Sequence, residues 1–337
     1  MGRGHRRWSW GAILSLAVGC RSVDHEVAER PAGALRPPSG PLRNLPPHPA
    51  GPAVSQLRLA TSGDGLAWER EDRTVVERAD APTCATVAGR LWVFFVLWED
   101  RDGALRDTTV AAWTEDLDTW SLAEVEVGGI PADYRSGVAD PCLLADAVPG
   151  SPSPHRLYFV LGGAGTRVFA ARSADLLHWV IEEGPGPDGS VHASPTGSVR
   201  DPAAVRLDDG GFWHYAGGDP RRGTHRATSR DGLHLDPLPP RHLLDGHALR
   251  LKPSNGQVVD GQPVFWAFPA DQGGRVADRI LRLDRVGTGF EVTSPPALEA
   301  TGDEPVIRDA AVCPHPAGDG LVMVYATSMP DAPPPPR

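Results

Sequence analysis

Four aspartates recur at regular intervals, each at the start of a short apolar run. Their carboxyl groups are the candidate reactive groups of this chain. Asp80, Asp140, Asp201 and Asp309 are separated by 60, 61 and 108 residues. The last interval spans two steps, and Lys252 occupies the position of the missing step. Carboxyl groups that meet in one place can act as general acid and general base. The series therefore predicts an acidic site, provided that the fold brings these positions together.

A second repeated motif recurs at similar intervals and indicates the elements that position the aspartates. It consists of a Ser or Thr, any residue, an Asp, a Gly or Leu, any two residues and then a large apolar side chain. An Asp and a Ser or Thr at the head of such a phrase accept hydrogen bonds from nearby backbone and close a tight turn. The copies are Ser62–Trp68, Thr114–Trp120, Ser173–Trp179 and Ser229–Leu235, with a degenerate fifth expected at Asp284–Phe290.

The two series together predict an all-β, five-bladed β-propeller with four antiparallel strands per blade. Each Asp or Lys position opens a hairpin of two strands, and each corner phrase joins the third strand to the fourth. The first corner precedes any such position, and Asp309 lacks a following corner. We therefore expect residues 57–77 to supply strands three and four of the blade that the C-terminus begins, which closes the ring and hides sheet edges. The alternative is an open β-sandwich with coincidental repeats.

The net charge of the chain limits the classes of partner that it is expected to bind. The net charge of −10 argues against nucleic acid. The expected state is a monomer, and neither a cofactor nor a metal ion is expected. Lys252 is the only lysine, against 32 arginines.

The N-terminus has the layout of an export signal. Three arginines precede an apolar stretch from Trp8 to Gly19. The segment Ala17–Cys20 resembles a bacterial lipoprotein box, which implies cleavage before Cys20 and a lipid on its sulfur. The chain would then be anchored in the bacterial cell envelope; the alternative is an ordinary signal peptide and a secreted protein.

The expected division of the chain follows from these patterns. Residues 1–20 form the signal, 21–52 a Pro-rich tether, 53–329 the propeller and 330–337 a Pro-rich tail. Residues 31–52 alone carry eight prolines, which is typical of a semi-rigid spacer.

Three cysteines remain after Cys20, and all lie on the expected innermost strands. Cys84, Cys142 and Cys313 show no metal-type spacing. We expect small buried apolar residues, with a bridge between Cys84 and Cys313 across neighbouring blades as the alternative.

The phrase Ser173–Trp179, together with Arg200-Asp201-Pro202 and the Asp-Asp-Gly-Gly turn at 208–211, resembles the five-bladed propeller glycoside hydrolases of families 43, 32, 62 and 68. The resemblance extends over residues 53–329 and implies an oligo- or polysaccharide as the partner. It implies three carboxylates at the mouth of a central funnel: a base or nucleophile, a residue that stabilises the transition state, and a Glu as general acid.

The resemblance assigns roles to individual residues. It implies Asp80 as the base-like residue and Asp201 as the stabiliser, with Asp140 on the blade between. Arg200 would donate to sugar hydroxyls, and Lys252 and Arg308 are further basic candidates for substrate binding. Asp309 is a secondary catalytic candidate.

The general acid is the point at which the sequence departs from the family pattern. A Glu is expected near residues 250–254, where Lys252 stands instead, and Glu304 is the nearest substitute. Lys252 could equally be a counter-ion for the aspartates. The sequence therefore leaves open a glycoside hydrolase, a non-catalytic glycan-binding propeller and a scaffold for a protein partner.

Overall fold

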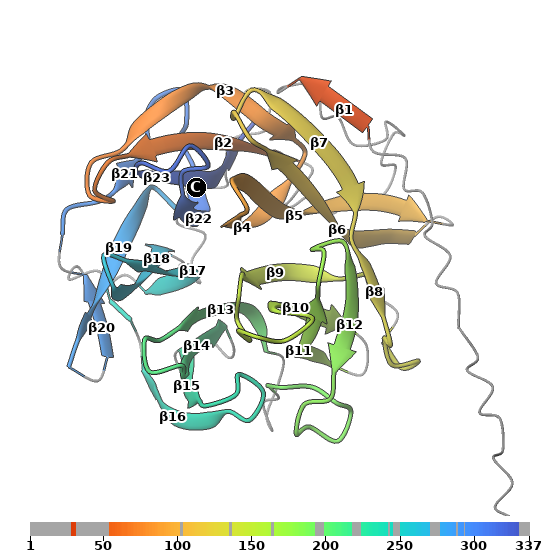
Figure 1. Cartoon of the computed structure of the whole chain (residues 1–337). Coiled ribbons are helices and arrows are strands. Elements are labelled where there is room, and N and C mark those ends of the chain that lie inside the picture. Colours follow the sequence, from red (N-terminus) through yellow and green to blue (C-terminus); the bar gives the residue numbers. More distant parts are fainter. Residues whose placement is uncertain are drawn as a thin grey trace, which may run out of the picture.

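Five antiparallel β-sheets stand around a central axis, as Figure 1 shows. The computed structural model describes residues 28–31, 54–101, 104–134, 137–162, 165–192, 199–217, 224–241, 243–244, 250–269, 277–287, 289–292 and 294–329. The predicted signal and the predicted tail lie outside these ranges, as does most of the predicted tether.

The sheets are the blades of a five-bladed propeller, and the first four are each built on four strands that follow one another in the chain. Blade 1 comprises β4 (Asp80–Val87), β5 (Arg90–Arg101), β6 (Ala104–Thr114) and β7 (Thr119–Glu124). Blade 2 comprises β9 (Ala139–Leu144), β10 (His155–Gly162), β11 (Thr166–Ser173) and β12 (His178–Glu182). Blade 3 comprises β13 (Arg200–Arg206), β14 (Phe212–Gly217), β15 (Thr224–Ser229) and β16 (Asp236–Arg241). Blade 4 comprises β17 (Leu251–Val259), β18 (Gln262–Pro269), β19 (Arg279–Val286) and β20 (Gly289–Val292).

Blade 5 is shared between the two ends of the described chain. Its strand order is β22 (Ile307–Pro314), β23 (Leu321–Ser328), β2 (Ser55–Ser62) and β3 (Glu69–Glu77). The pairing of β2 with β23 runs without a register shift from Ser55–Ser328 to Ser62–Leu321. The predicted closure of the ring by N-terminal strands three and four is thus confirmed.

Three short strands extend the blades beyond the predicted four. β1 (Ala28–Pro31) adds to β7, β8 (Glu126–Gly128) runs parallel to β12, and β21 (Leu298–Glu299) pairs with β19. β1 lies within the predicted tether.

The corner phrase forms the turn that its residues predict. The Ser173 hydroxyl accepts a hydrogen bond from the Leu176 amide at 2.9 Å, and Asp175 Oδ1 accepts from the amides of residues 177 and 178. The Trp179 indole donates to the Leu176 carbonyl at 3.0 Å. The residue after the Asp has φ of +70°, and φ of +74° and +77° falls on Gly65 and Gly232 in two other copies. Glycine adopts this conformation without steric cost.

The degenerate fifth copy does not form this corner, so that prediction was wrong. Asp284 lies inside β19 opposite Glu291, and its carboxylate accepts a hydrogen bond from Arg282 at 2.8 Å. The chain reverses between Val286 and Gly289. The two extra residues of this copy are accommodated in a tight hairpin instead of an Asp-capped turn.

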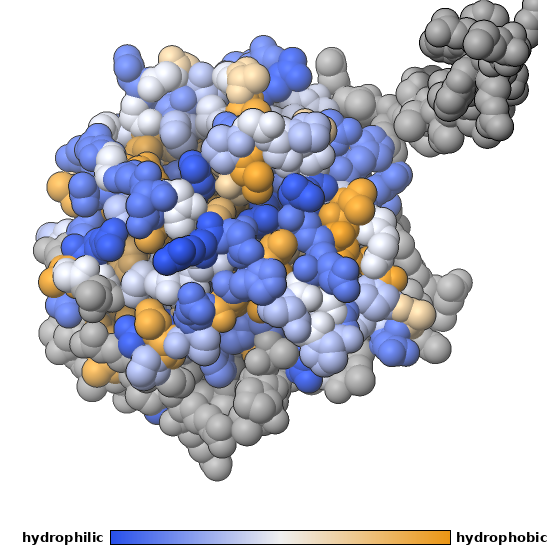
Figure 2. Space-filling model, turned by 60° about the horizontal axis from the view of Figure 1, so that its bottom comes forward, coloured by the Kyte–Doolittle hydropathy of each residue, from blue (hydrophilic) through white to orange (hydrophobic). Residues whose placement is uncertain are grey.

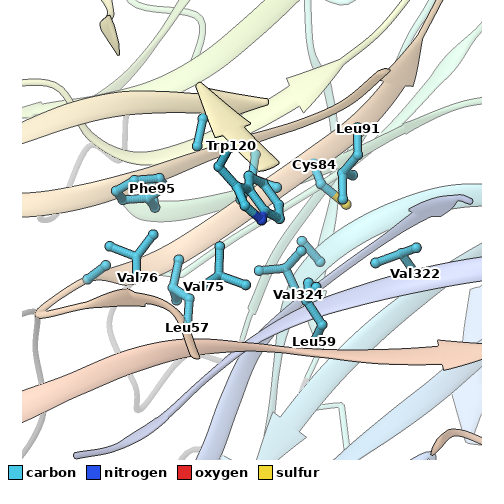
Figure 3. Close-up of a cluster of buried hydrophobic side chains, with 14 of the residues drawn as sticks. Leu57, Leu59, Val75, Val76, Cys84, Leu91, Phe95, Trp120, Val322 and Val324 are labelled. Atoms are coloured by element: carbon cyan, nitrogen blue, oxygen red, sulfur yellow. The ribbon is translucent and has the colours of Figure 1, made fainter. Parts of the chain in front are cut away.

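The core consists of five clusters, each packed between two neighbouring blades. In the cluster between blades 5 and 1, Leu57 and Val324 pack against Phe95 and Trp120, as Figure 3 shows. The face in Figure 2 is largely hydrophilic, with its hydrophobic residues in separated groups. Among the described residues no helix has the length and apolar character needed to cross a membrane.

Candidate functional site

The innermost strands β4, β9, β13, β17 and β22 surround the axis, and each brings the start of its apolar run to the same end (Figure 1). The cavity there is lined by residues of all five strands. They are Ala81, Pro82, Asp140, Pro141, Asp201, Pro202, Lys252, Pro253, Ser254 and Asp309. We expect the aspartates at the starts of the inner strands to lie together at the axis, and Asp140, Asp201 and Asp309 do so.

A β-bulge at the start of each inner strand aims these side chains. Register shifts occur in all five inner-strand pairings. Asp140, Asp201 and Asp309 have φ of +46°, +53° and +48°. Asp adopts this left-handed region more readily than most residues, and a bulge turns a side chain away from its regular alternation. The local sequence thus favours the conformation that places the carboxyls in the cavity.

Asp80 does not occupy the equivalent position, which corrects the predicted register of the first blade. Ala81 has the matching φ of +48° and lines the cavity, whereas Asp80 precedes it as Arg308 precedes Asp309. The signal was present in the sequence, because Pro82 aligns with Pro141, and both follow the cavity-facing residue. The Asp80 side chain is 7 % exposed and contacts Arg308. Its role as a base stays a prediction.

Lys252 joins two of the aspartates. Its Nζ lies 2.9 Å from Asp201 Oδ1 and 3.6 Å from Asp309 Oδ1, and 5.3 Å from the centre of the Phe268 ring. Burial favours the neutral amine, but Asp201, Asp309 and Asp140 outweigh it and raise the pKa of Lys252. The ammonium is therefore firmly charged, and the predicted counter-ion role is what the contacts show.

Arg308 continues the network toward blade 1. Its guanidinium donates to Asp309 Oδ2 at 3.2 Å, to Asp80 Oδ2 at 2.8 Å and to Ser55 Oγ at 2.9 Å. Burial opposes the charge on Arg308, yet Asp80 and Asp309 raise its pKa. Burial raises the pKa of Asp80, and Arg308 counteracts that effect. Arg308 thus serves the aspartates directly, which leaves fewer of its donors for a ligand.

The surroundings of Asp140 in the cavity shift the pKa of its carboxyl group. Burial, followed by repulsion from Asp201, raises the pKa of Asp140 well above its usual range, and its carboxyl is hydrogen-bonded to Asp201. The Asp140 carboxyl thus holds its proton more tightly than an exposed Asp does, in contact with Asp201. A Cβ on Gly217 would lie 2.9 Å from Asp201 Oδ2, so glycine leaves the room that this carboxylate occupies.

The other predicted site residues lie elsewhere. Arg200 is exposed at the start of β13 and is not among the residues that line the cavity. Glu304 is 2 % exposed and accepts hydrogen bonds from Arg58 at 2.7 Å and Arg70 at 2.9 Å, with Tyr325 at 3.1 Å. It too is absent from the cavity lining. Ser254 is not among the site residues predicted from the sequence, but it lines the cavity. Its hydroxyl donates a hydrogen bond to the Ala310 carbonyl at 2.8 Å.

The enclosed space is small. The cavity measures about 20 Å³, which is room for about one water molecule. A ligand larger than a water molecule therefore does not fit between the carboxyls.

Asp140→Asn is expected to raise the free energy of unfolding by about 1–2 kcal/mol at neutral pH. The folded state binds the Asp140 proton more tightly than the unfolded state, so this group's contribution to stability falls as pH rises from about 4. An amide donates to Asp201 without that cost. Chemical denaturation of both proteins should show the gain at neutral pH and its disappearance near pH 3. A gain that is equal at both pH values would contradict a protonated Asp140.

Comparisons with known proteins find similarity in structure. No protein-family model matches the chain, and no curated protein matches it. A thermostable family-43 glycoside hydrolase superposes with a TM-score of 0.58 at 15% identity, covering 76% of this chain and 86% of that one. A putative glycoside hydrolase from Parabacteroides distasonis gives 0.51 at 15% identity, covering 81% and 93%. The arabinanase Arb43A of Bacillus subtilis gives 0.50 at 12% identity, covering 73% and 92%.

These likenesses extend over most of each chain and concern its architecture. They agree with the resemblance carried by the corner phrase and by Arg200-Asp201-Pro202. In fold, the chain is a five-bladed β-propeller of the kind found in family-43 glycoside hydrolases.

Proposed function

We propose that this protein binds a glycan over the axial cluster of Asp140, Asp201, Lys252 and Asp309 without cleaving it. A lipid on Cys20 would hold it in the bacterial cell envelope. The propellers that it resembles in structure include a family-43 glycoside hydrolase and an arabinanase. A carbohydrate is therefore the ligand class that the fold favours.

The observation that carries the proposal is the position of Lys252 between two carboxylates of the cavity. Cleavage by two carboxyl groups needs them about 5–9.5 Å apart on either side of the glycosidic bond. Here Asp140 and Asp201 share a hydrogen bond, and Lys252 bridges Asp201 to Asp309. The ammonium group therefore stands between Asp201 and Asp309, where a glycosidic bond held by these two carboxylates would have to lie.

The same arrangement is suited to holding hydroxyl groups. The side chains of Lys252 and Asp201 are 28% and 18% exposed, so both keep one side toward the mouth. Their mutual ion pair fixes them in place, and preorganised polar groups lose less entropy when a ligand binds. Carboxylate oxygens accept from sugar hydroxyls, and the ammonium donates to them.

The proposal is tested by calorimetric titration of the purified full chain with arabino-, xylo-, fructo- and manno-oligosaccharides, alongside release of aryl groups from the matching aryl glycosides. We expect binding without turnover. Asp201→Asn should weaken binding about tenfold, which is the loss of about one charged hydrogen bond. Arg200→Gln, which lies outside the cavity, is the matched control and should bind as the parent protein does.

A second candidate is hydrolysis with Asp140 as proton donor. The raised pKa of Asp140, which contacts Asp201, favours it, because a carboxyl group that holds its proton tightly can act as a general acid. Turnover of any aryl glycoside that Asp140→Asn abolishes would establish this candidate and overturn the first. Absence of both binding and turnover over the whole panel would overturn both and favour a protein partner.

A further inference from the structure

The sulfur atoms of Cys84 and Cys313 lie 2.7 Å apart, although 229 residues separate them in the chain. Cys84 belongs to β4 of blade 1 and Cys313 to β22 of blade 5. A covalent bond between two sulfurs measures about 2.05 Å, so a small movement of the side chains brings these atoms to bonding distance. We propose that Cys84 and Cys313 form a disulfide that closes the propeller ring covalently.

The surroundings suit a bond that persists once made. Cys84 and Cys313 are 2% and 0% exposed, inside the apolar cluster between blades 5 and 1. Figure 3 shows Cys84 in that cluster beside Leu91. Burial, and then the neighbouring Cys313, raises the pKa of the Cys84 thiol. A reductant in solution cannot reach sulfurs buried in this way, and attack requires a thiolate.

The location of the pair means that the bond would stabilise the junction between blades 1 and 5. The ring is otherwise closed by the pairing of β2 with β23 within blade 5 and by the apolar cluster between blades 5 and 1. The loop from Cys84 to Cys313 contains blades 2, 3 and 4 in full, whereas β2 and β3 lie outside it. The bond therefore holds β4 against β22 even when the N-terminal strands dissociate. A cross-link over so long a loop also removes much freedom from the unfolded chain.

The chemistry requires an oxidant of the disulfide class. The two thiols lose two protons and two electrons as the sulfur–sulfur bond forms. The electrons reduce a disulfide, either in a thiol oxidoreductase or in oxidised glutathione, to two thiols. Because the folded core excludes such a partner, the bond forms before the cluster between blades 5 and 1 is complete. Export of the chain, as its N-terminus predicts, would bring it to an oxidising compartment.

The test is peptide mapping of the full chain produced by export and unfolded in iodoacetamide without reductant. We expect a cross-linked pair of peptides that contain Cys84 and Cys313, two hydrogens lighter than their sum, and alkylation of Cys142. Cys142 is the internal reference, because it is equally buried on an inner strand. Alkylation of both Cys84 and Cys313 would overturn the proposal.

Thermal unfolding provides an independent readout. A reductant added during unfolding should lower the midpoint of the parent protein by roughly 5–10 °C. Cys142→Ser should show the same shift, and the double variant Cys84→Ser, Cys313→Ser should show none. A shift that is equal in all three proteins would contradict the bond. The mapping of the parent protein decides the matter even where the double variant fails to fold.

Discussion

Lys252→Met is expected to lower the free energy of unfolding by about 2–4 kcal/mol at neutral pH. The ammonium of Lys252 contacts Asp201 and Asp309, and its side chain is 28% exposed. Methionine keeps much of the length and volume of the side chain but leaves Asp201 without the ammonium group and Asp309 with Arg308 as its remaining cation. The loss comes from that uncompensated charge, and denaturant titration of both proteins measures it.

The pH dependence identifies the cause. In Lys252→Met the folded state should bind protons at Asp201 and Asp309 more tightly than the unfolded state does. Its stability should therefore fall as pH rises, and the deficit should be greatest at neutral pH and smaller at about pH 4. Lys252→Arg is the matched control, since it keeps the positive charge. A deficit that does not change with pH would mean that lost packing against Phe268, and not charge, explains the effect.

Glu304→Gln is expected to cost about 3 kcal/mol of stability. The Glu304 carboxylate is 3% exposed and accepts hydrogen bonds from Arg58 on β2 and Arg70 on β3, with Tyr325 of β23 at 3.1 Å. It connects the N-terminal strands to the C-terminal ones where blade 5 closes. A neutral amide removes the buried charged partner of both arginines, leaves Arg58 with the exposed Asp72, and directs an NH₂ group toward donors.

Two comparisons make this prediction specific. Asp303→Asn changes the exposed neighbour of Glu304 in the same way and should alter stability by less than about 0.5 kcal/mol. Glycan binding by Glu304→Gln, measured well below its unfolding midpoint, should match that of the parent protein. Loss of a glycosidase turnover with unchanged stability would instead make Glu304 a catalytic acid.

The local turns and the count of blades could be predicted because each depends on a few adjacent residues. The Ser, the Asp and the Trp of the phrase at 173–179 contact one another or the backbone between them, so their spacing alone specifies the corner. The shared fifth blade followed from the same repeats, since an unmatched corner at the start and an unmatched Asp309 at the end complement each other.

The site could be predicted only in outline. Asp80 was placed at the axis because it opens an apolar run, but the bulge there puts Ala81 into the cavity and directs Asp80 to Arg308. A bulge is set by pairing with the neighbouring strand, so the residues of β4 indicate it only when Pro82 is aligned with Pro141 of β9. Glu304 was a candidate because it is near Asp309 in sequence, yet its partners come from β2, β3 and β23.

From its repeats alone, then, the chain specifies five similar sheets, the corners between their strands and the acidic positions around the axis. Those features depend on contacts between residues close in sequence. The pairing of Lys252 with Asp201 and Asp309, the raised pKa of Asp140 and the approach of Cys84 to Cys313 exist only once the ring has closed. Charge, burial and reactivity at the axis are properties of side chains from different blades, so they arise from the packing of the sheets.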